Sequence, residues 1–177
     1  MTAVDPEPSR STITEQRYTG VGFLPETFTV ALEAVAFVKA FRKKLVIEFE
    51  MAGLALTPAE ARVLIFLGHN EGVRQAQLAH IVSCEPMTLV GILDRLEAAG
   101  LVIRARDEAD RRAKCVYLEP QGKALVPRVE AIVTALCDSS ELGLGEQQLE
   151  LMRVALSHMT GNLHSPLNIS ARASDAH

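Results

Sequence analysis

The alternation of hydrophobic and polar positions predicts a series of helices with one short hairpin. Between residues 86 and 98, hydrophobic residues recur at the spacing that lines one face of a helix: Leu89, Ile92, Leu93 and Leu96. Pro86 suits the first turn of this helix, because the N–H that proline lacks would have no helical partner there. Gly100 marks the end, since glycine is preferred just past a helix C-terminus. The pattern therefore predicts an amphipathic helix of about four turns.

Two short β-prone segments follow this helix, residues 101–103 and 115–118, and a charged loop from Arg104 to Lys114 joins them. Helix, strand, basic loop and strand occur in this order in a winged helix. Such a domain lays one helix in a DNA major groove and a hairpin against the neighbouring backbone. We call residues 86–98 the reader helix and the hairpin the wing.

A second helix is predicted upstream, where Thr57, Pro58 and Glu60 form a capping-box pattern with proline at the first helical position. This helix is expected to run to about residue 70, where Gly72 follows. A short third helix should then turn three residues inward: Leu78, Ala79 and Val82. Two short helices joined by a tight turn and followed by a hairpin make a helix-turn-helix with a wing.

Longer helices are expected at both ends of the chain. From residue 25 to about residue 50, hydrophobic residues cover more than one stripe, which favours burial on two sides, one of them against a second copy of the chain. Two C-terminal helices are predicted from two hydrophobic sets, the first comprising Leu125, Val129, Ile132, Val133 and Leu136, and the second Leu149, Met152, Leu156 and Met159. Pro127 implies that the first of these helices begins near Val126 or is kinked. The residues from Gly161 onward are expected to lie outside the last helix.

These elements predict a mainly α fold with a small β-hairpin wing, an α+β winged helix-turn-helix with N- and C-terminal dimerisation helices. The expected organisation is a flexible arm (1–24), a dimerisation helix (25–56), the DNA-binding domain (57–119), the C-terminal dimerisation helices (120–163) and a loose tail (164–177).

Composition narrows the function classes. The chain has 177 residues and a net charge of −4, with 18 basic against 22 acidic residues, which argues against a histone-like coat on nucleic acid. The wing is locally positive: between residues 101 and 117, five basic residues face three acidic ones. No paired carboxylates, nucleophile–base set or phosphate loop indicates an enzyme.

The cysteines and histidines suggest no further chemistry. Cys84, Cys115 and Cys137 are odd in number and have no metal-ligand spacing, which indicates free thiols in a reducing cytoplasm. The histidines show no ligand spacing either, so neither a metal nor a cofactor is expected. No signal peptide is visible, and no apolar run reaches the ~20 residues of a membrane span.

The outer face of the reader helix provides the first candidate site residues: Met87, Thr88, Gly91 and Arg95. Thr88 can hydrogen-bond a base or place its methyl group on thymine, whereas Arg95 is better placed for a phosphate. Gly91 either removes a side chain from the position best placed to enter the groove or only allows close packing; both interpretations stay open.

The wing provides the second group: Asp110, Arg111, Arg112 and Lys114. An arginine at a hairpin tip can reach the minor groove, where narrow A·T-rich stretches concentrate negative potential. Asp110 is interpreted as a brace, because a carboxylate can fix the direction of a guanidinium in a bidentate pair. The alternative is a solvated charged turn.

The stretch from Gln77-Leu-Ala through Leu93-Asp-Arg-Leu-Glu and Gly100-Leu-Val-Ile-Arg to Asp110-Arg-Arg-Ala-Lys and Val116-Tyr-Leu resembles the MarR family of bacterial transcription regulators. The resemblance covers roughly residues 28–162, and its most specific part is the wing. It implies a homodimer with intertwined terminal helices. It also implies binding to a pseudo-palindromic operator in double-stranded DNA, with release by a small phenolic or otherwise aromatic ligand.

Carried over by residue, the family's wing Asp-x-Arg falls on Asp110 and Arg112, with Arg111 and Lys114 as nearby backbone contacts. The sequence departs from the family's pattern at two places. Val90-Gly91 stands where the family often has Thr-Arg, so base readout is expected to differ. Leu118-Glu119 stands for Leu-Thr, which changes the capping of the next helix.

The resemblance also implies an effector site between the dimerisation helices and the DNA-binding domain, with Phe37, Phe41, Leu64 and Ile132 as candidate lining residues; plain core positions are the alternative. Two other functions remain open. One is a winged-helix protein-interaction module without DNA binding, and the other is a redox-responsive regulator acting through Cys84, which precedes the reader helix.

Overall fold

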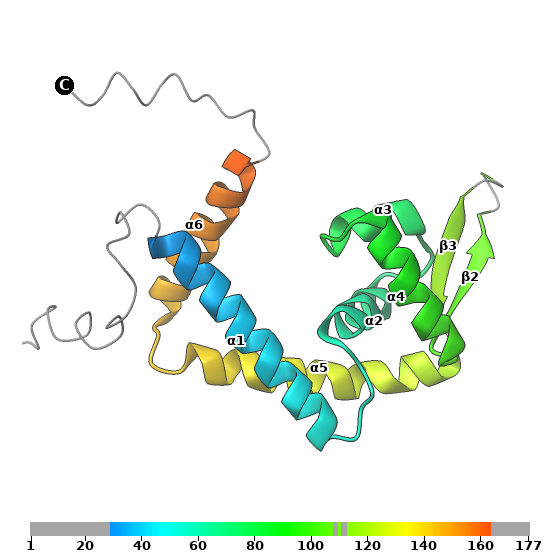
Figure 1. Cartoon of the computed structure of the whole chain (residues 1–177), viewed down its shortest axis with the longest axis horizontal. Helices are drawn as coiled ribbons and strands as arrows, with labels where there is room; N and C mark the ends of the chain where they lie inside the picture. Colours follow the sequence, from blue (N-terminus) through cyan, green and yellow to red (C-terminus); the bar gives the residue numbers. More distant parts are fainter. Residues whose placement is uncertain (1–28, 108–109, 111–112, 164–177) are drawn as a thin grey trace, which may run out of the picture. The chain divides into compact units, whose positions relative to one another are not determined.

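The computed structural model describes residues 29–107, 110 and 113–163, which form six helices and three strands (Figure 1). The helices are α1 (Thr29–Met51), α2 (Pro58–His69), α3 (Gln75–Ile81), α4 (Pro86–Ala98), α5 (Pro120–Glu141) and α6 (Glu146–Leu163). The strands are β1 (Val73–Arg74), β2 (Val102–Arg106) and β3 (Lys114–Leu118). The chain divides into two compact units, residues 1–44 and residues 45–177.

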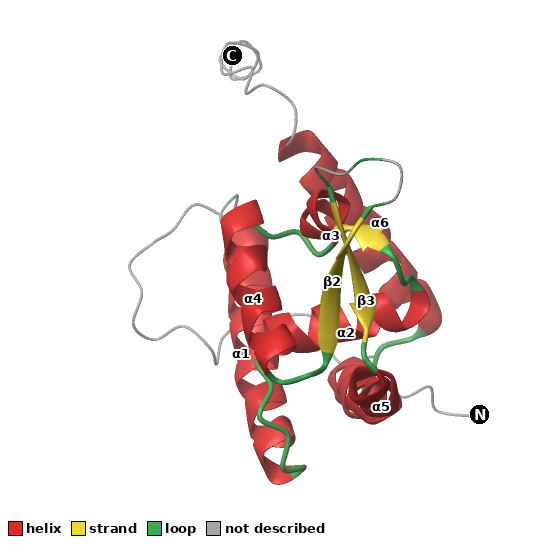
Figure 2. Ribbon diagram, turned by 90° about the vertical axis from the view of Figure 1, so that its right-hand side faces the viewer, coloured by secondary structure: helices red, strands yellow, loops and turns green. Residues whose placement is uncertain are grey.

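The wing is part of a three-stranded antiparallel sheet with the order β1-β3-β2 (Figure 2). In the hairpin, Arg106 pairs with Lys114 and Val102 with Leu118. Strand β1 was not predicted, because two residues are too short to show a period. Gly72 turns the chain into β1 with φ +75°, and its N–H donates to the carbonyl of Val116 at 3.0 Å. The sheet therefore ties the start of the helix-turn-helix to the wing.

The predicted core of the DNA-binding domain is confirmed. All four inward residues of the reader helix α4 are buried, as are the three residues predicted to face inward in the short third helix. They pack in one cluster with residues of α2, the hairpin and α5: Val63, Leu64, Leu67, Val102, Val116, Leu118 and Val126. The hydrophobic period thus fixes which face of α4 remains outside.

The predicted ends of two helices are confirmed. The Thr57 hydroxyl accepts from the N–H of Glu60 at 3.2 Å, and the Glu60 carboxylate accepts from the N–H of Thr57 at 2.8 Å, which completes the capping box. Gly100 ends α4 in the left-handed region, with φ +67°. Glu119, which stands where the family has threonine, gives α5 no side-chain cap.

The C-terminal helices exclude one of the two alternatives for Pro127 and contradict the expectation for Gly161. Helix α5 begins at Pro120 and continues through Pro127 without starting afresh near Val126. Pro127 is exposed, so water can satisfy the carbonyl that loses its helical partner. Helix α6 includes Gly161, because a single glycine weakens a helix by only about 1 kcal/mol relative to alanine and does not end it.

Helices α1 and α6 carry exposed hydrophobic residues. In residues 30–38 of α1 these are Val30, Leu32, Val35, Phe37 and Val38, and α6 has no buried residue. Among the described residues, no single helix has both the length and the apolar composition to cross a membrane, and one bent pair, α3 with α4, meets these criteria only jointly. The same part of the chain contains no cluster of three or more potential metal-ligating side chains.

Candidate nucleic-acid interface

The outer face of α4 presents the predicted reading residues to solvent. The side chain of Met87 is 80% exposed at the first turn of the helix, and Thr88 beside it is also exposed. A Cβ at Gly91 would come no closer than 3.9 Å to any neighbour, the nearest being Nη1 of Arg95. Close packing within the chain therefore does not explain Gly91, and the open position on the outer face remains as its interpretation.

Arg95 forms an ion pair with a buried carboxylate. Its Nε donates to Oε1 of Glu60 at 2.6 Å, and the Glu60 side chain is almost fully buried at the start of α2. Burial alone would raise the pKa of Glu60, but the hydrogen bonds from Thr57 and Arg95 lower it below its ordinary value. The capping box of α2 thus also orients an arginine on the outer face of the reader helix.

One of the five basic residues of the wing, Arg104, connects β2 to α4. The Arg104 side chain is 15% exposed and lies between two carboxylates of α4. Its Nε donates to Glu97 at 3.1 Å and its Nη2 lies 2.7 Å from Asp94, so the C-terminal part of α4 is fastened to β2. These hydrogen bonds raise the pKa of Arg104 and lower that of Glu97. The carboxylates of Asp94 and Glu97 therefore offset the positive charge of Arg104, and we assign this residue a structural role.

The ends of the wing loop are joined through Asp107. Its N–H donates to the carbonyl of Ala113 at 3.1 Å, and its Oδ1 accepts from the N–H of Asp110 at the same distance. Its Oδ2 accepts from Nε of Arg74 in β1 at 2.6 Å. Sequence reasoning assigned a bracing role to Asp110 and missed this one, since only the pairing of β1 with β3 brings Arg74 near residue 107.

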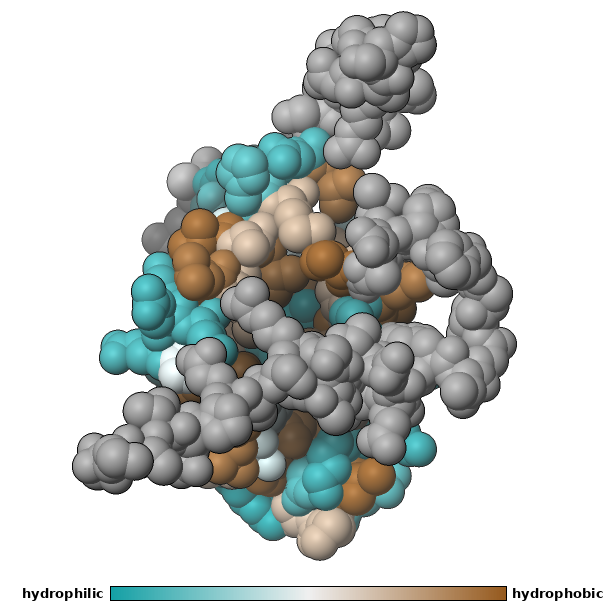
Figure 3. Space-filling view, turned by 90° about the vertical axis from the view of Figure 1, so that its left-hand side faces the viewer, coloured by the Kyte–Doolittle hydropathy of each residue, from teal (hydrophilic) through white to brown (hydrophobic). Residues whose placement is uncertain are grey.

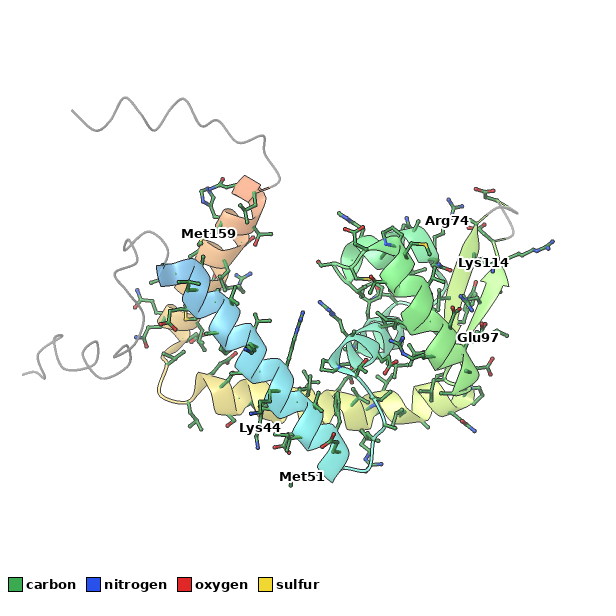
Figure 4. All side chains as sticks on the ribbon, viewed as in Figure 1. Lys44, Met51, Arg74, Glu97, Lys114 and Met159 are labelled. Carbon is green, nitrogen blue, oxygen red and sulfur yellow. The ribbon has the colours of Figure 1, made fainter. Side chains whose placement is uncertain are left out.

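The predicted wing cations are only partly within the described residues. Arg111 and Arg112 lie outside them. Lys114 is exposed at the start of β3 (Figure 4). Arg106, its pairing partner on β2, is also exposed. Neither makes an ion pair with any described residue. Both positively charged side chains are therefore accessible to solvent at the described end of the wing.

The four candidate effector residues fall in different places. The rings of Phe37 and Phe41 lie 5.9 Å apart on α1, Leu64 is fully buried in the core of the second unit, and Ile132 is half-buried on α5. A hollow of about 590 Å³ lies between the end of α2 and the start of α5, but none of the four residues lines it.

The cysteines differ in their surroundings. Cys84 is half-buried in the turn before α4, and its N–H donates to the carbonyl of Ala79 at 3.0 Å. Cys115 is buried beneath the Arg74–Asp107 pair, and its Sγ lies 3.6 Å from Asp107. Burial, together with the nearby carboxylate, raises the pKa of the Cys115 thiol. Burial and a raised pKa both disfavour the reactive thiolate form of Cys115.

Comparison with known proteins places these features in one family. The family model described as MarR family matches residues 56–114, from just before α2 to the first residue of β3. The chain is 30% identical to the HTH-type transcriptional regulator TtmR of Methylorubrum extorquens (strain PA1) over 138 residues, which span 78% of this chain and 67% of the relative.

Solved structures share the fold. The MepR–DNA complex of S. aureus superposes with a TM-score of 0.69 at 23% identity, covering 76% of this chain and 98% of MepR. CouR of Rhodococcus jostii RHA1, bound to p-coumaroyl-CoA, superposes with a TM-score of 0.65 at 22% identity, covering 75% and 92%. The buried face of α4, the braced wing and the match over residues 56–114 lead to one assignment: this chain belongs to the MarR family of winged-helix DNA-binding transcription regulators.

Proposed function

We propose that the protein is a homodimeric, sequence-specific repressor that leaves its operator when a small aromatic ligand binds. The observation that carries the DNA-binding part is the exposed face of α4, with Met87, Thr88 and Arg95 opposite a fully buried face. Such a helix can enter the major groove without disturbing the core. The MepR structure, which has the same fold, contains DNA.

The wing supplies the sequence-independent attraction. Arg104 is neutralised by α4, so the contribution of the described residues comes from Arg106 and Lys114. Arg112 is proposed to enter the minor groove, with Arg111 beside it on the backbone. A local positive charge of this kind allows binding to DNA although the whole chain carries −4.

The homodimer is supported by the terminal helices. Four residues of α6, Met152, Leu156, Met159 and Leu163, form an exposed hydrophobic stripe. Figure 3 shows hydrophobic residues at the surface of the face that it views. Exposed stripes of this kind mark interaction surfaces, and a dimer would place two copies of α4 on a pseudo-palindromic operator.

Effector release is proposed from the family and from CouR, whose solved structure holds p-coumaroyl-CoA. Phe37, Phe41, Leu64 and Ile132 remain the proposed lining residues. A ligand that binds the free dimer more tightly than the DNA-bound dimer lowers DNA affinity by that difference. The proposed place of action is the bacterial cytoplasm, where the chromosome lies.

Fluorescence anisotropy with DNA from upstream of the protein's own gene tests this function. We expect specific binding, and log affinity that falls linearly with log salt concentration. Lys114→Gln should weaken binding and reduce the salt slope by about one charge. Arg112→Ala should weaken operator binding with little loss of stability. Arg62→Gln, which changes an exposed arginine on α2, is the matched control.

Three other results would revise the proposal. Equal, weak binding to operator and scrambled DNA would favour the protein-interaction module. A monomer in sedimentation velocity at micromolar concentration would contradict the dimer. Loss of DNA affinity after peroxide treatment, abolished by Cys84→Ser, would favour the redox-responsive regulator.

A further inference from the structure

The wing is connected to the helix-turn-helix by a pair of charged side chains from distant parts of the sequence. Arg74 is the last residue of β1 and directly precedes α3, whereas Asp107 follows the last residue of β2. In the sheet, Arg74 pairs with Cys115 of β3, so its side chain has to cross β3 to reach Asp107. The Nε of Arg74 meets Oδ2 of Asp107 at 2.6 Å.

The two partners are shielded to different extents. The side chain of Arg74 is 44% exposed, whereas that of Asp107 is only 12% exposed. Asp107 is surrounded by hydrogen-bond donors: the Arg74 guanidinium, the N–H of Asp110 and the thiol of Cys115. Its carboxylate is therefore largely shielded from solvent at the end of β2, where the wing loop begins.

The same residue is hydrogen-bonded to two described residues of the wing loop. One oxygen holds the N–H of Asp110 and the other holds Arg74, while the backbone of Asp107 bonds Ala113 across the loop. A hairpin of two five-residue strands can twist and bend on its own. The contact of Arg74 in β1 with Asp107 at the end of β2 restricts this motion already in the free protein.

We propose that Arg74 and Asp107 are positioning residues that hold the wing in its DNA-binding orientation, so that operator affinity depends on a carboxylate that does not itself contact DNA. This inference rests on the proposed DNA-binding function. It differs from the family's wing Asp-x-Arg, which falls on Asp110 and Arg112. Preorganisation of this kind increases affinity because less conformational freedom is lost on binding.

The proposal predicts a change in DNA affinity opposite to the change that electrostatic repulsion alone would give. Neutralising an acidic side chain near DNA removes repulsion from phosphates and should tighten binding. If Asp107 is a brace, Asp107→Asn weakens binding instead. Arg74→Gln should weaken it to the same extent, by about fivefold each, the size of a partly exposed ion pair. The double variant should be no weaker than either single variant.

The experiment measures the affinity of these three variants for a duplex selected by the wild-type protein from random DNA. Glu85→Gln is the matched control, because Glu85 is an exposed acid at the start of α4 with no ion pair among the described residues. Its neutralisation should leave affinity unchanged or higher. Hydroxyl-radical footprinting should show that the brace variants lose protection in the outer minor grooves and keep it at the central major grooves. General unfolding would not give that pattern.

Each outcome decides between the alternatives. If Asp107→Asn binds as well as the wild type or more tightly, the brace is refuted and the DNA-binding function stands. If Arg74→Gln and Asp107→Asn lower affinity additively, Arg74 contacts DNA itself and the brace is again refuted. If the wild type selects no duplex, both proposals fall. Should Asp107→Asn fail to fold, Arg74→Gln and its footprint decide alone.

Discussion

Helices α4 and α6 have hydrophobic residues at similar helical spacings, yet the stripe of α4 is buried and that of α6 is exposed. On α4 the four apolar residues are at most 3% exposed, because α2, α3 and the sheet lie against them. On α6, Leu149 of the predicted set is half-buried, whereas Met152, Leu156 and Met159 are 40–51% exposed and Leu163, one turn further on, is 79% exposed. The hydrophobic period therefore shows that a helix needs a partner without showing whether that partner lies in the same chain.

The polar contacts of the two helices show the same contrast. Helix α4 is fastened to α2 through Arg95 and Glu60 and to β2 through Arg104. The ion pair given by α6, Arg153 with Glu150, lies within the helix and is exposed on both sides. Long-range ion pairs therefore occur on α4, the helix that packs against α2 and β2. In the proposed dimer, α6 would obtain its position from the partner chain.

The largest expected effect comes from removing the same side chain in each stripe. Leu93→Ala should destabilise the protein by about 2–5 kcal/mol at any protein concentration, because it leaves a cavity in a closed core. Leu156→Ala should leave the winged helix folded and raise the concentration at which the dimer dissociates. Urea unfolding at two protein concentrations, with sedimentation velocity, measures both. Equal, concentration-independent destabilisation by the two variants would contradict the contrast.

The second prediction compares one substitution at two helical glycines. A Cβ at Gly122 of α5 would lie 2.1 Å from the carbonyl oxygen of Leu101, a backbone atom that cannot turn aside. Gly122→Ala should therefore destabilise by roughly 1–3 kcal/mol or more. At Gly161 of α6 nothing lies within 4 Å of the added atom.

The matched variant, Gly161→Ala, should stabilise the helix by a few tenths of a kcal/mol to about 1 kcal/mol. Thermal unfolding of the two variants gives the comparison. A loss of dimer in Gly161→Ala would show that a partner chain packs closely on this glycine and would require the open space at Gly161 to be interpreted anew.

The sequence predicted those features that arise within a few consecutive residues. The apolar period of α4, its stop at Gly100 and the capping box of Thr57 and Glu60 each need only local chemistry, and all three are confirmed. The fold class followed from the order of these elements together with the resemblance to the family.

The features that sequence reasoning missed depend on residues far apart in the chain. Strand β1 forms because β3 is available more than 40 residues later. Arg104 was counted as part of a positive loop, although two carboxylates of α4 neutralise it. Arg95 and Arg74 were not expected to meet Glu60 and Asp107, which lie 35 and 33 residues away. Charge counts along a sequence do not show which charges pair in space.

The smallest expected effect concerns two glutamates. The pKa of Glu60 is depressed in the folded protein by its hydrogen bonds with Thr57 and Arg95, against the opposing effect of burial. A depressed pKa means that the ionised form stabilises the fold above the pKa of the unfolded state, about 4.3, and that this contribution is lost as pH falls through the folded pKa. Glu60→Gln should therefore destabilise by on the order of 1–2 kcal/mol at pH 7. The difference from the wild type should shrink as the pH falls below about 4.

Glu150→Gln on α6 is the matched control, because its pair with Arg153 is exposed. It should change stability by less than about 0.5 kcal/mol at either pH. Urea titrations at pH 7 and near pH 3.5 measure both variants. If the deficit of Glu60→Gln were the same at both pH values, its carboxylate would not be linked to folding as an ion. The fastening of α2 to α4 would then rest on hydrogen bonds that glutamine can also make.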